Sequence, residues 1–320
     1  MPEPTLLTDA LPAPPAGCLP VASPEARELL AGVRMVYTDL DGTLLAPGGR
    51  LLVAHDGTPQ VATAAALVAL KTAGIDVALI TGRGADQGSE FLRLLNLDCY
   101  IGEVGGYLLR RTDVARAEEH YMIGAWEHTV LSPGLAPGVL PADTNPFELI
   151  GRSGIIERLA NAFPGMLFTY PATRSVSWSL WGHIDVKAAQ NLLDREALPL
   201  QLLDNGILYH TPAPLPGDAT PHIYHLLPAG VTKMTAIAAD QQFRALAPAA
   251  TLAIGDSAVD LQMGEATGVF VMMANGLRNP AVQEAVAARI AAGAPVLHTT
   301  RPTTDGWVEF ADALLAARSA

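Results

Sequence analysis

Residues 35–43 read Met-Val-Tyr-Thr-Asp-Leu-Asp-Gly-Thr, and the interpretation of the whole chain starts from this stretch. It completes an apolar, β-branched run, Val33 to Thr38, of the kind that forms a buried strand. Two carboxylates, Asp39 and Asp41, follow at once. Carboxylates that converge at a strand end repel each other unless a cation lies between them, and Mg²⁺ is usually held by one or two carboxylates with water and substrate phosphate. The stretch therefore predicts a hard-cation site in which one carboxylate is a nucleophile and the other moves protons.

The composition limits the class of protein. A length of 320 residues suggests two domains, or one domain with a large insertion. Half of the residues are apolar, which is enough for a substantial core. The formal net charge of −12 argues against a nucleic-acid partner, so an anionic substrate would need positive charge supplied locally. Cys18 and Cys99 are far apart and have no short-spaced metal-ligand partner, which favours free thiols in a reducing cytoplasm.

No stretch predicts a membrane span, because charges or prolines interrupt the most apolar segments; residues 61–80, for example, contain Lys71 and Asp76. Residues 1–32 are rich in Pro and Ala but lack the basic start and apolar run of a signal peptide. We expect them to form a poorly ordered arm with a short helix at 24–31. The sequence does not indicate an oligomeric state.

Strand and helix patterns alternate through residues 33–112 and again through 221–320, which predicts one α/β core domain built from both segments. Its expected architecture is a Rossmann-like parallel sheet with helices on both faces. The expected strands are residues 33–38, 76–81, 99–104, 251–254, 269–273 and 295–298. The expected helices are residues 63–72, 87–95, 260–266, 280–288 and 306–317.

Residues 113–220 have a different character and predict an α+β cap domain inserted into the core. The strands there look longer and two-sided, and loops rich in Pro and Gly separate them from helical patterns. The expected strands are residues 167–181 and 200–210, and the expected helices are residues 147–162 and 185–196.

Polar residues stand at the ends of several predicted core strands or at the start of the helix that follows. Asp39 and Asp41 follow the first strand, Thr81 ends the second, and Asp256 follows a later one; Lys233 opens a helix just after another apolar run. In open α/β sheets, ligands bind outside the carboxyl ends of the strands. The sequence therefore predicts a single site at this edge of the sheet.

These residues form an ordered set of four motifs that resembles the haloacid dehalogenase superfamily of phosphohydrolases. The motifs are Asp39-Leu-Asp41-Gly-Thr43, Thr81-Gly-Arg83, Lys233 and Gly255-Asp256-Ser-Ala-Val-Asp260. The long insertion between the second and third motifs is similar to that of the Cof-type branch, which carries a large α/β cap. Further matches are Ala274-Asn275-Gly276 and Asp305-Gly306.

The resemblance implies a role for each motif. Asp39 would attack phosphorus and form an aspartyl-phosphate, while Asp41 would protonate the leaving oxygen and then deprotonate the hydrolytic water. The implied cofactor is Mg²⁺, held by Asp39, the main-chain carbonyl of Asp41, and Asp256. The implied phosphate-binding residues are Thr81, Gly82, Lys233 and Asn275. Behind them, Asp260 would anchor Lys233 or a metal-bound water, and Thr43 would support the first motif.

The chain departs from the family pattern in two places. Val259 stands where the family usually has Asn before the last aspartate, which would weaken control of the metal or phosphate. After the third strand, residues 102–106 read Gly-Glu-Val-Gly-Gly in place of the usual Asn-Gly. Neither change removes a catalytic acid.

Each motif also has a purely structural interpretation. An Asp-Gly pair can mark a turn, Asp256 can cap a helix, and Asp260 can complement the dipole of the first helical turn. Thr81 alone could be a turn residue, and Lys233 alone could be a solvated helix start.

The resemblance favours a Mg²⁺-dependent phosphomonoesterase whose partner is a small phosphorylated metabolite, with a sugar phosphate as the first expectation. A phosphotransferase or phosphosugar mutase on the same core, and a catalytically silent binding module, stay open as alternatives. Residues that could contact the substrate are Arg83, Glu103, Arg174, Trp178 and Asn205.

Overall fold

The computed structural model describes residues 11–113, 116–126, 145–170, 174–208 and 213–318, and these form two compact units. The first unit is Met1–Ile80 with Ile237–Ala320, and the second is Thr81–Ala236. The predicted insertion, residues 113–220, lies inside the second unit, which extends beyond it on both sides. In the described part of the chain, no helix combines the length and the apolar character that crossing a bilayer requires.

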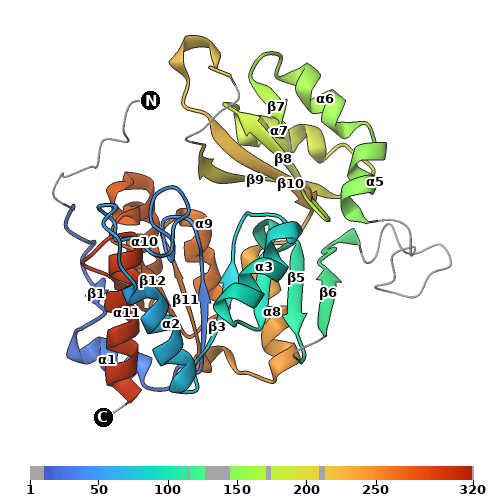
Figure 1. The fold of residues 1–320 in the computed structure, drawn as a ribbon. Helices are drawn as coiled ribbons and strands as arrows, with labels where there is room; N and C mark the ends of the chain where they lie inside the picture. Colours follow the sequence, from blue (N-terminus) through green and yellow to red (C-terminus); the bar gives the residue numbers. More distant parts are fainter. Residues whose placement is uncertain (1–10, 114–115, 127–144, 171–173, 209–212, 319–320) are drawn as a thin grey trace. The chain divides into compact units, whose positions relative to one another are not determined.

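The first unit is built on parallel strands that run in the order β1-β13-β12-β11-β2-β3 (Figure 1). Their bounds are β1 Leu19–Pro20, β2 Met35–Thr38, β3 Asp76–Ile80, β11 Thr251–Gly255, β12 Val269–Met272 and β13 Val296–His298. Every residue of β2, β11 and β12 is buried, as expected for strands covered on both faces. The predicted parallel α/β core is confirmed.

Two neighbouring residues of β2 show how helices cover both faces of this sheet. Successive side chains of a strand point to opposite faces. The Tyr37 hydroxyl donates to Asp240 of α8, whereas the Thr38 hydroxyl accepts a hydrogen bond from the indole of Trp307 in α11. Helices α8 and α11 therefore lie on opposite sides of β2. The helices that contribute to this unit are α1 Pro24–Leu30, α2 Ala62–Thr72, α8 Lys233–Arg244, α9 Ala258–Leu261, α10 Pro280–Ala291 and α11 Thr303–Arg318.

The N-terminal segment differs from the expected poorly ordered arm. Residues 1–10 lie outside the described residues, but strand β1 pairs with β13, and Ser23 caps helix α1 by accepting a hydrogen bond from Ala26. Ala26 and Leu30 are fully buried. The segment from Leu19 onward therefore contributes to the core, because Val21, Ala26 and Leu30 are buried, although Leu29 is exposed.

The second unit contains two sets of antiparallel strands. One has the order β4-β5-β6, and helix α3 contacts it; the other has the order β7-β8-β10-β9. The strand bounds are β4 Cys99–Gly102, β5 Tyr107–Arg111, β6 Ala117–Tyr121, β7 Leu167–Thr169, β8 Trp178–Gly182, β9 Leu200–Ile207 and β10 His222–Pro228. The helix bounds are α3 Ala85–Leu95, α5 Pro146–Arg152, α6 Ile155–Ala162 and α7 Val186–Leu193. Strands β5 and β6 were not expected.

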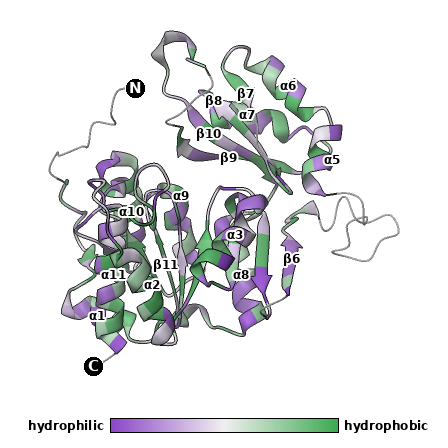
Figure 2. Ribbon diagram, viewed as in Figure 1, coloured by the Kyte–Doolittle hydropathy of each residue, from purple (hydrophilic) through white to green (hydrophobic). Residues whose placement is uncertain are grey.

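One face of the β7–β10 sheet carries the apolar core of this unit. Leu180, Leu202 and Leu226 point to this face and pack with the buried side of α6 and α7, while Figure 2 shows hydrophilic residues on the outer side of α6. The opposite face carries Ser179 and His225, which lie opposite each other in the strand register. The second unit therefore has one helix-covered sheet face and one polar sheet face.

Two predicted elements of the second unit are interrupted. The helix expected at residues 147–162 is split into α5 and α6, because Gly154 adopts a left-handed conformation (φ 71°) between them. The single strand expected at residues 167–181 is two strands, β7 and β8, and residues 171–173 between them lie outside the described residues. The last residues of the strand expected at 200–210 also lie outside them.

Candidate active site

Asp39 and Asp256 lie side by side at the carboxyl ends of two neighbouring strands. Strands β2 and β11 are parallel and pair Thr38 with Ile254, so the residues that follow them reach the same edge. The Asp39 amide continues the ladder by donating to the Ile254 carbonyl at 2.9 Å. This is the arrangement that the strand pattern predicts.

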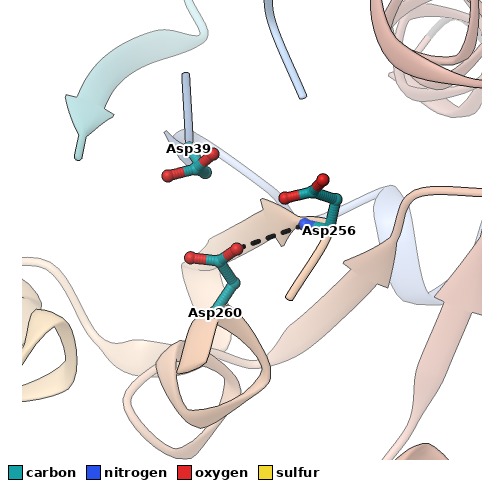
Figure 3. A group of neighbouring side chains, drawn as sticks. All are labelled: Asp39, Asp256 and Asp260. Carbon is teal, nitrogen blue, oxygen red and sulfur yellow. Dashed lines mark hydrogen bonds between the residues drawn. The ribbon is translucent and has the colours of Figure 1, made fainter. Parts of the chain in front are cut away.

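Asp260 completes a cluster of three carboxylates (Figure 3). One ligand-type oxygen from each of Asp39, Asp256 and Asp260 lies within 4.8 Å of the others. Asp260 is fixed by a capping box: its Oδ2 accepts from the Asp256 amide at 3.2 Å and from the Ser257 hydroxyl at 2.7 Å, while Ser257 caps helix α9. The helix cap is therefore Ser257 and not Asp256, which corrects the structural alternative considered for Asp256.

The donor set fits a hard divalent cation. Asp39 and Asp260 are buried and Asp256 is half-buried, and carboxylate oxygens are the ligands that Mg²⁺ prefers. Gly42, in the turn after Asp41, has φ 86°, and a Cβ there would overlap the Asp256 carboxylate. The buried hydroxyl of Thr43 has no hydrogen-bond partner among the described residues. A tight turn of backbone thus closes over the carboxylates and leaves a polar group for a ligand.

Asn275 holds this arrangement together. Its amide nitrogen donates to the Gly42 carbonyl and to Asp256 Oδ2, both at 2.9 Å, and its oxygen accepts from the Thr303 amide at 3.0 Å. Both donors of the side chain are therefore used by protein acceptors. This favours a positioning role for Asn275 over the phosphate contact that the sequence predicted.

The second motif lies at the start of the second unit. Thr81 is buried, and its hydroxyl accepts from the Arg83 amide at 3.2 Å. The Arg83 guanidinium donates to Gln87 and lies 5.6 Å from the centre of the Phe91 ring. Lys233, the first residue of α8, is also buried. These residues and the aspartates belong to different units, so their predicted joint action on one phosphate stays a prediction.

Glu103 connects the loop after β4 to the segment that enters β8. Its fully buried carboxylate accepts from the amides of Ser175 (2.8 Å), Val176 (2.9 Å) and Ser177 (2.7 Å), and from the Ser177 hydroxyl (3.1 Å). Glu103 and Val104 both have positive φ, an unusual conformation for residues with side chains. Glu103 therefore acts inside the protein, which argues against the substrate contact considered for it.

Three polar side chains surround Gly82. Arg174 Nη1 donates to the Gly82 carbonyl at 2.6 Å. A Cβ at Gly82 would lie 2.5 Å from Asn205 Nδ2 and 3.2 Å from His225 Nε2, so a side chain there would displace Asn205. Burial, with the charges of Arg174 and Lys233, lowers the pKa of His225 well below its ordinary value, so this imidazole is neutral. Arg174 and Asn205, predicted as substrate residues, therefore lie against the second motif.

Trp178 is the predicted substrate residue that the structure places elsewhere. Its ring stacks on Phe147 with 4.4 Å between centroids, and its indole donates to the Phe147 carbonyl at 2.7 Å. Trp178 points to the helix-covered face, because strand register pairs it with Leu226 of the core. Ser177, a partner of Glu103, and His225, a neighbour of Gly82, were not predicted as site residues, since neither belongs to a sequence motif.

Comparison with known proteins places these features in a family pattern. A family model described as haloacid dehalogenase-like hydrolase matches residues 36–120 and 217–290, which together contain all four motifs. No protein of curated function is similar enough in sequence to count as a relative.

Solved structures share the fold. Sucrose-phosphatase from Synechocystis, crystallised with sucrose and phosphate, is 15% identical over 88% of this chain and 97% of its own, with a TM-score of 0.54. A phosphatase of the haloalkanoate (HAD) enzyme superfamily from Bacteroides thetaiotaomicron is 16% identical over 89% and 96%, with a TM-score of 0.54. A structure described as showing a trigonal-bipyramidal intermediate in a phosphoryl-transfer superfamily is 13% identical over 89% and 99%, with a TM-score of 0.55. At these identities the likeness establishes the fold.

Proposed function

Since the chain belongs to the haloacid dehalogenase-like hydrolases, we propose that it is a Mg²⁺-dependent phosphomonoesterase acting on a small phosphorylated metabolite. The observation that carries this proposal is the cluster of Asp39, Asp256 and Asp260 at the carboxyl ends of adjacent strands. The cluster joins the residue proposed as nucleophile to a cation-binding donor set, and both are needed for phosphoryl transfer.

The proposed reaction has two steps on the chain's own carboxylates. A carboxylate oxygen of Asp39 attacks phosphorus, and the ester P–O bond breaks while Asp41 gives its proton to the leaving oxygen. Asp41 then takes a proton from water, which attacks the aspartyl-phosphate and releases inorganic phosphate and free Asp39. The exposed position of Asp41 suits this exchange with substrate and water.

Asp39, Asp256 and the main-chain carbonyl of Asp41 would hold the Mg²⁺, and Asp260 lies close enough to join through water. Bound there, the ion would neutralise charge on the transferring phosphoryl oxygens. Asn275 keeps the Asp256 carboxylate and the Gly42 turn in place.

The second motif and Lys233 would bind the phosphate in this proposal. A protein with a net charge of −12 needs local cations and donors for a dianion, and buried Lys233 with the Thr81 hydroxyl are suited to that task. A sugar phosphate is the first choice of substrate, as the fold is shared with a sucrose-phosphatase bound to sucrose and phosphate. We also propose a cytoplasmic location, because neither Cys18 nor Cys99 is in a disulfide.

The test is phosphate release from a panel of phosphorylated metabolites, measured with Mg²⁺ and with EDTA. We expect release with Mg²⁺ and almost none with EDTA or in Asp39→Asn. Transfer of the phosphoryl group to a second hydroxyl, without free phosphate, would instead identify a mutase. Tight metal binding without turnover of any ester would identify a silent binding module.

A further inference from the structure

Arg174 is a shielded cation that lacks an acidic partner among the residues that the structure describes. Its Nη1 donates to the Gly82 carbonyl, while its Nε is shielded from solvent and has no hydrogen-bond partner among the described residues. No carboxylate of the described residues forms an ion pair with it. A shielded charge without a counter-charge is costly, and such groups are normally paired. Among the described residues, the charge of Arg174 is therefore left without an ion-pair partner, and an anion from outside the chain could supply one.

Glu103 is the acid whose charge acts most strongly on Arg174, but it forms no ion pair with the guanidinium. Its two oxygens already accept four hydrogen bonds from Ser175, Val176 and Ser177. Burial lowers the pKa of Arg174, and the charges of Glu103 and Asp86 oppose this shift without forming an ion pair with it. The segment that carries Arg174 is thus held firmly by Glu103 while the guanidinium itself stays available.

The surroundings of Arg174 are suited to an oxygen-rich ligand. Arg174 lies on the carbonyl side of Gly82, and the Asn205 amide and the neutral His225 imidazole lie against the Cα of the same residue. Guanidinium and amide groups donate to carboxylate or phosphate oxygens, and Arg does so with paired donors. Gly82 directly follows Thr81, so a group bound here would be next to the second motif.

We propose that Arg174 binds a second acidic group of the substrate, so that the preferred substrate is a phosphate monoester that also carries a carboxylate or another phosphate. This rests on the proposed function, in which Lys233 and Mg²⁺ meet the charge of the phosphate that is transferred. Arg174 is then a surplus cation, and its position beside the second motif makes it a specificity residue.

Two matched pairs of esters test this. 3-Phosphoglycerate and glycerol 3-phosphate differ by a carboxylate, and fructose 1,6-bisphosphate and fructose 6-phosphate differ by a phosphate, so the two pairs distinguish the two acids. We expect the wild type to prefer the doubly acidic ester of at least one pair. Arg174→Gln should raise KM for that ester about 10- to 100-fold, the range for a lost charged hydrogen bond, and should raise KM for p-nitrophenyl phosphate, which carries no second acid, by a clearly smaller factor.

Controls separate recognition from folding. Replacing the exposed Arg152 of α5, in Arg152→Gln, should leave every KM unchanged. Arg174→Lys should retain part of the preference for the doubly acidic ester, and this variant replaces Arg174→Gln in the test if Arg174→Gln does not fold. Equal loss for all esters with an unchanged melting temperature would show that Arg174 only clamps Gly82, and would overturn the proposal. So would a wild type that hydrolyses p-nitrophenyl phosphate but prefers neither acid.

A binding measurement keeps this test separate from catalysis. Failure to hydrolyse any ester of the metabolite panel would refute the proposed function and not the anion site. In that case 3-phosphoglycerate or fructose 1,6-bisphosphate should still raise the melting temperature of the wild type more than that of Arg174→Gln. Equal shifts in the two proteins would refute the anion site.

Discussion

Replacing Glu103 by Gln tests how firmly the loop after β4 holds the segment that carries Arg174. Oε1 of Glu103 accepts from the Ser175 amide, and Oε2 accepts from the Val176 amide and from the amide and hydroxyl of Ser177. The substitution keeps the shape of the side chain but turns one acceptor into a donor and removes the charge.

The expected cost follows from these contacts. In the more favourable orientation of the new glutamine side chain, its amide oxygen takes the place of Oε2 and keeps the three hydrogen bonds. Each bond becomes neutral and loses about 1 kcal/mol, because charge-assisted hydrogen bonds are roughly twice as strong as neutral ones. The new NH₂ faces the Ser175 N–H, which costs about 1 kcal/mol more. The total of about 4 kcal/mol corresponds to about a 10³-fold easier opening of residues 175–177.

Hydrogen–deuterium exchange read by mass spectrometry measures this opening. We expect the amides of residues 175–177 to exchange about 10²- to 10³-fold faster in Glu103→Gln, since exchange follows the local opening equilibrium. Glu157→Gln, an exposed glutamate on α6, should leave the exchange as in the wild type. Unchanged protection in Glu103→Gln would refute the assigned role of the carboxylate.

Three further substitutions test other parts of the site. Asp41→Asn should slow turnover about 10²- to 10⁴-fold, and less for esters with good leaving groups; equal slowing of phosphoenzyme formation for good and poor leaving groups would contradict an acid role. Asn275→Ala should weaken Mg²⁺ binding about 10-fold in titration calorimetry, whereas Asn161→Ala, at an exposed position, should not. Equal Mg²⁺ affinity in the two variants would refute the positioning role of Asn275. His225 has a lowered pKa when folded, so wild-type stability should be complete above about pH 6.5 and fall below it by up to about 1.4 kcal/mol per pH unit. Urea unfolding should show that slope reduced in His225→Asn but not in the exposed His183→Asn, and an unreduced slope would show that His225 is not the group responsible.

The first unit was predictable because local signals and its parallel topology agree. The helix ending near Gly74 and the strands that precede Asp39 and Asp256 are each marked by their own residues. Once β2 and β11 are parallel neighbours, their following aspartates must meet, so the acid cluster follows from the strand pattern. The small N-terminal strand β1 was missed, because a two-residue strand has no periodicity to read.

The contacts of the second unit could not be predicted in the same way. Glu103 and Ser177 are far apart in sequence, and the local residues of each indicate only a turn or a strand. The helix-covered face of β8 was also undetermined: a strand's alternation shows which residues share a face but not which face is buried. Both a substrate contact and core packing were therefore open for Trp178, and the structure shows it packed on Phe147.

Chemical capture of a phosphorylated Asp39 addresses the proposed reaction directly. Rapid acid quenching of a single turnover, followed by borohydride reduction, converts an aspartyl-phosphate to homoserine, and peptide mass spectrometry locates the modified residue. With Mg²⁺ and a hydrolysed ester, we expect homoserine at position 39 in the wild type, more of it in Asp41→Asn with a good leaving group, and none in Asp39→Asn. Phosphate release that continues in Asp39→Asn, or turnover with no modification at position 39, would contradict the nucleophilic role of Asp39.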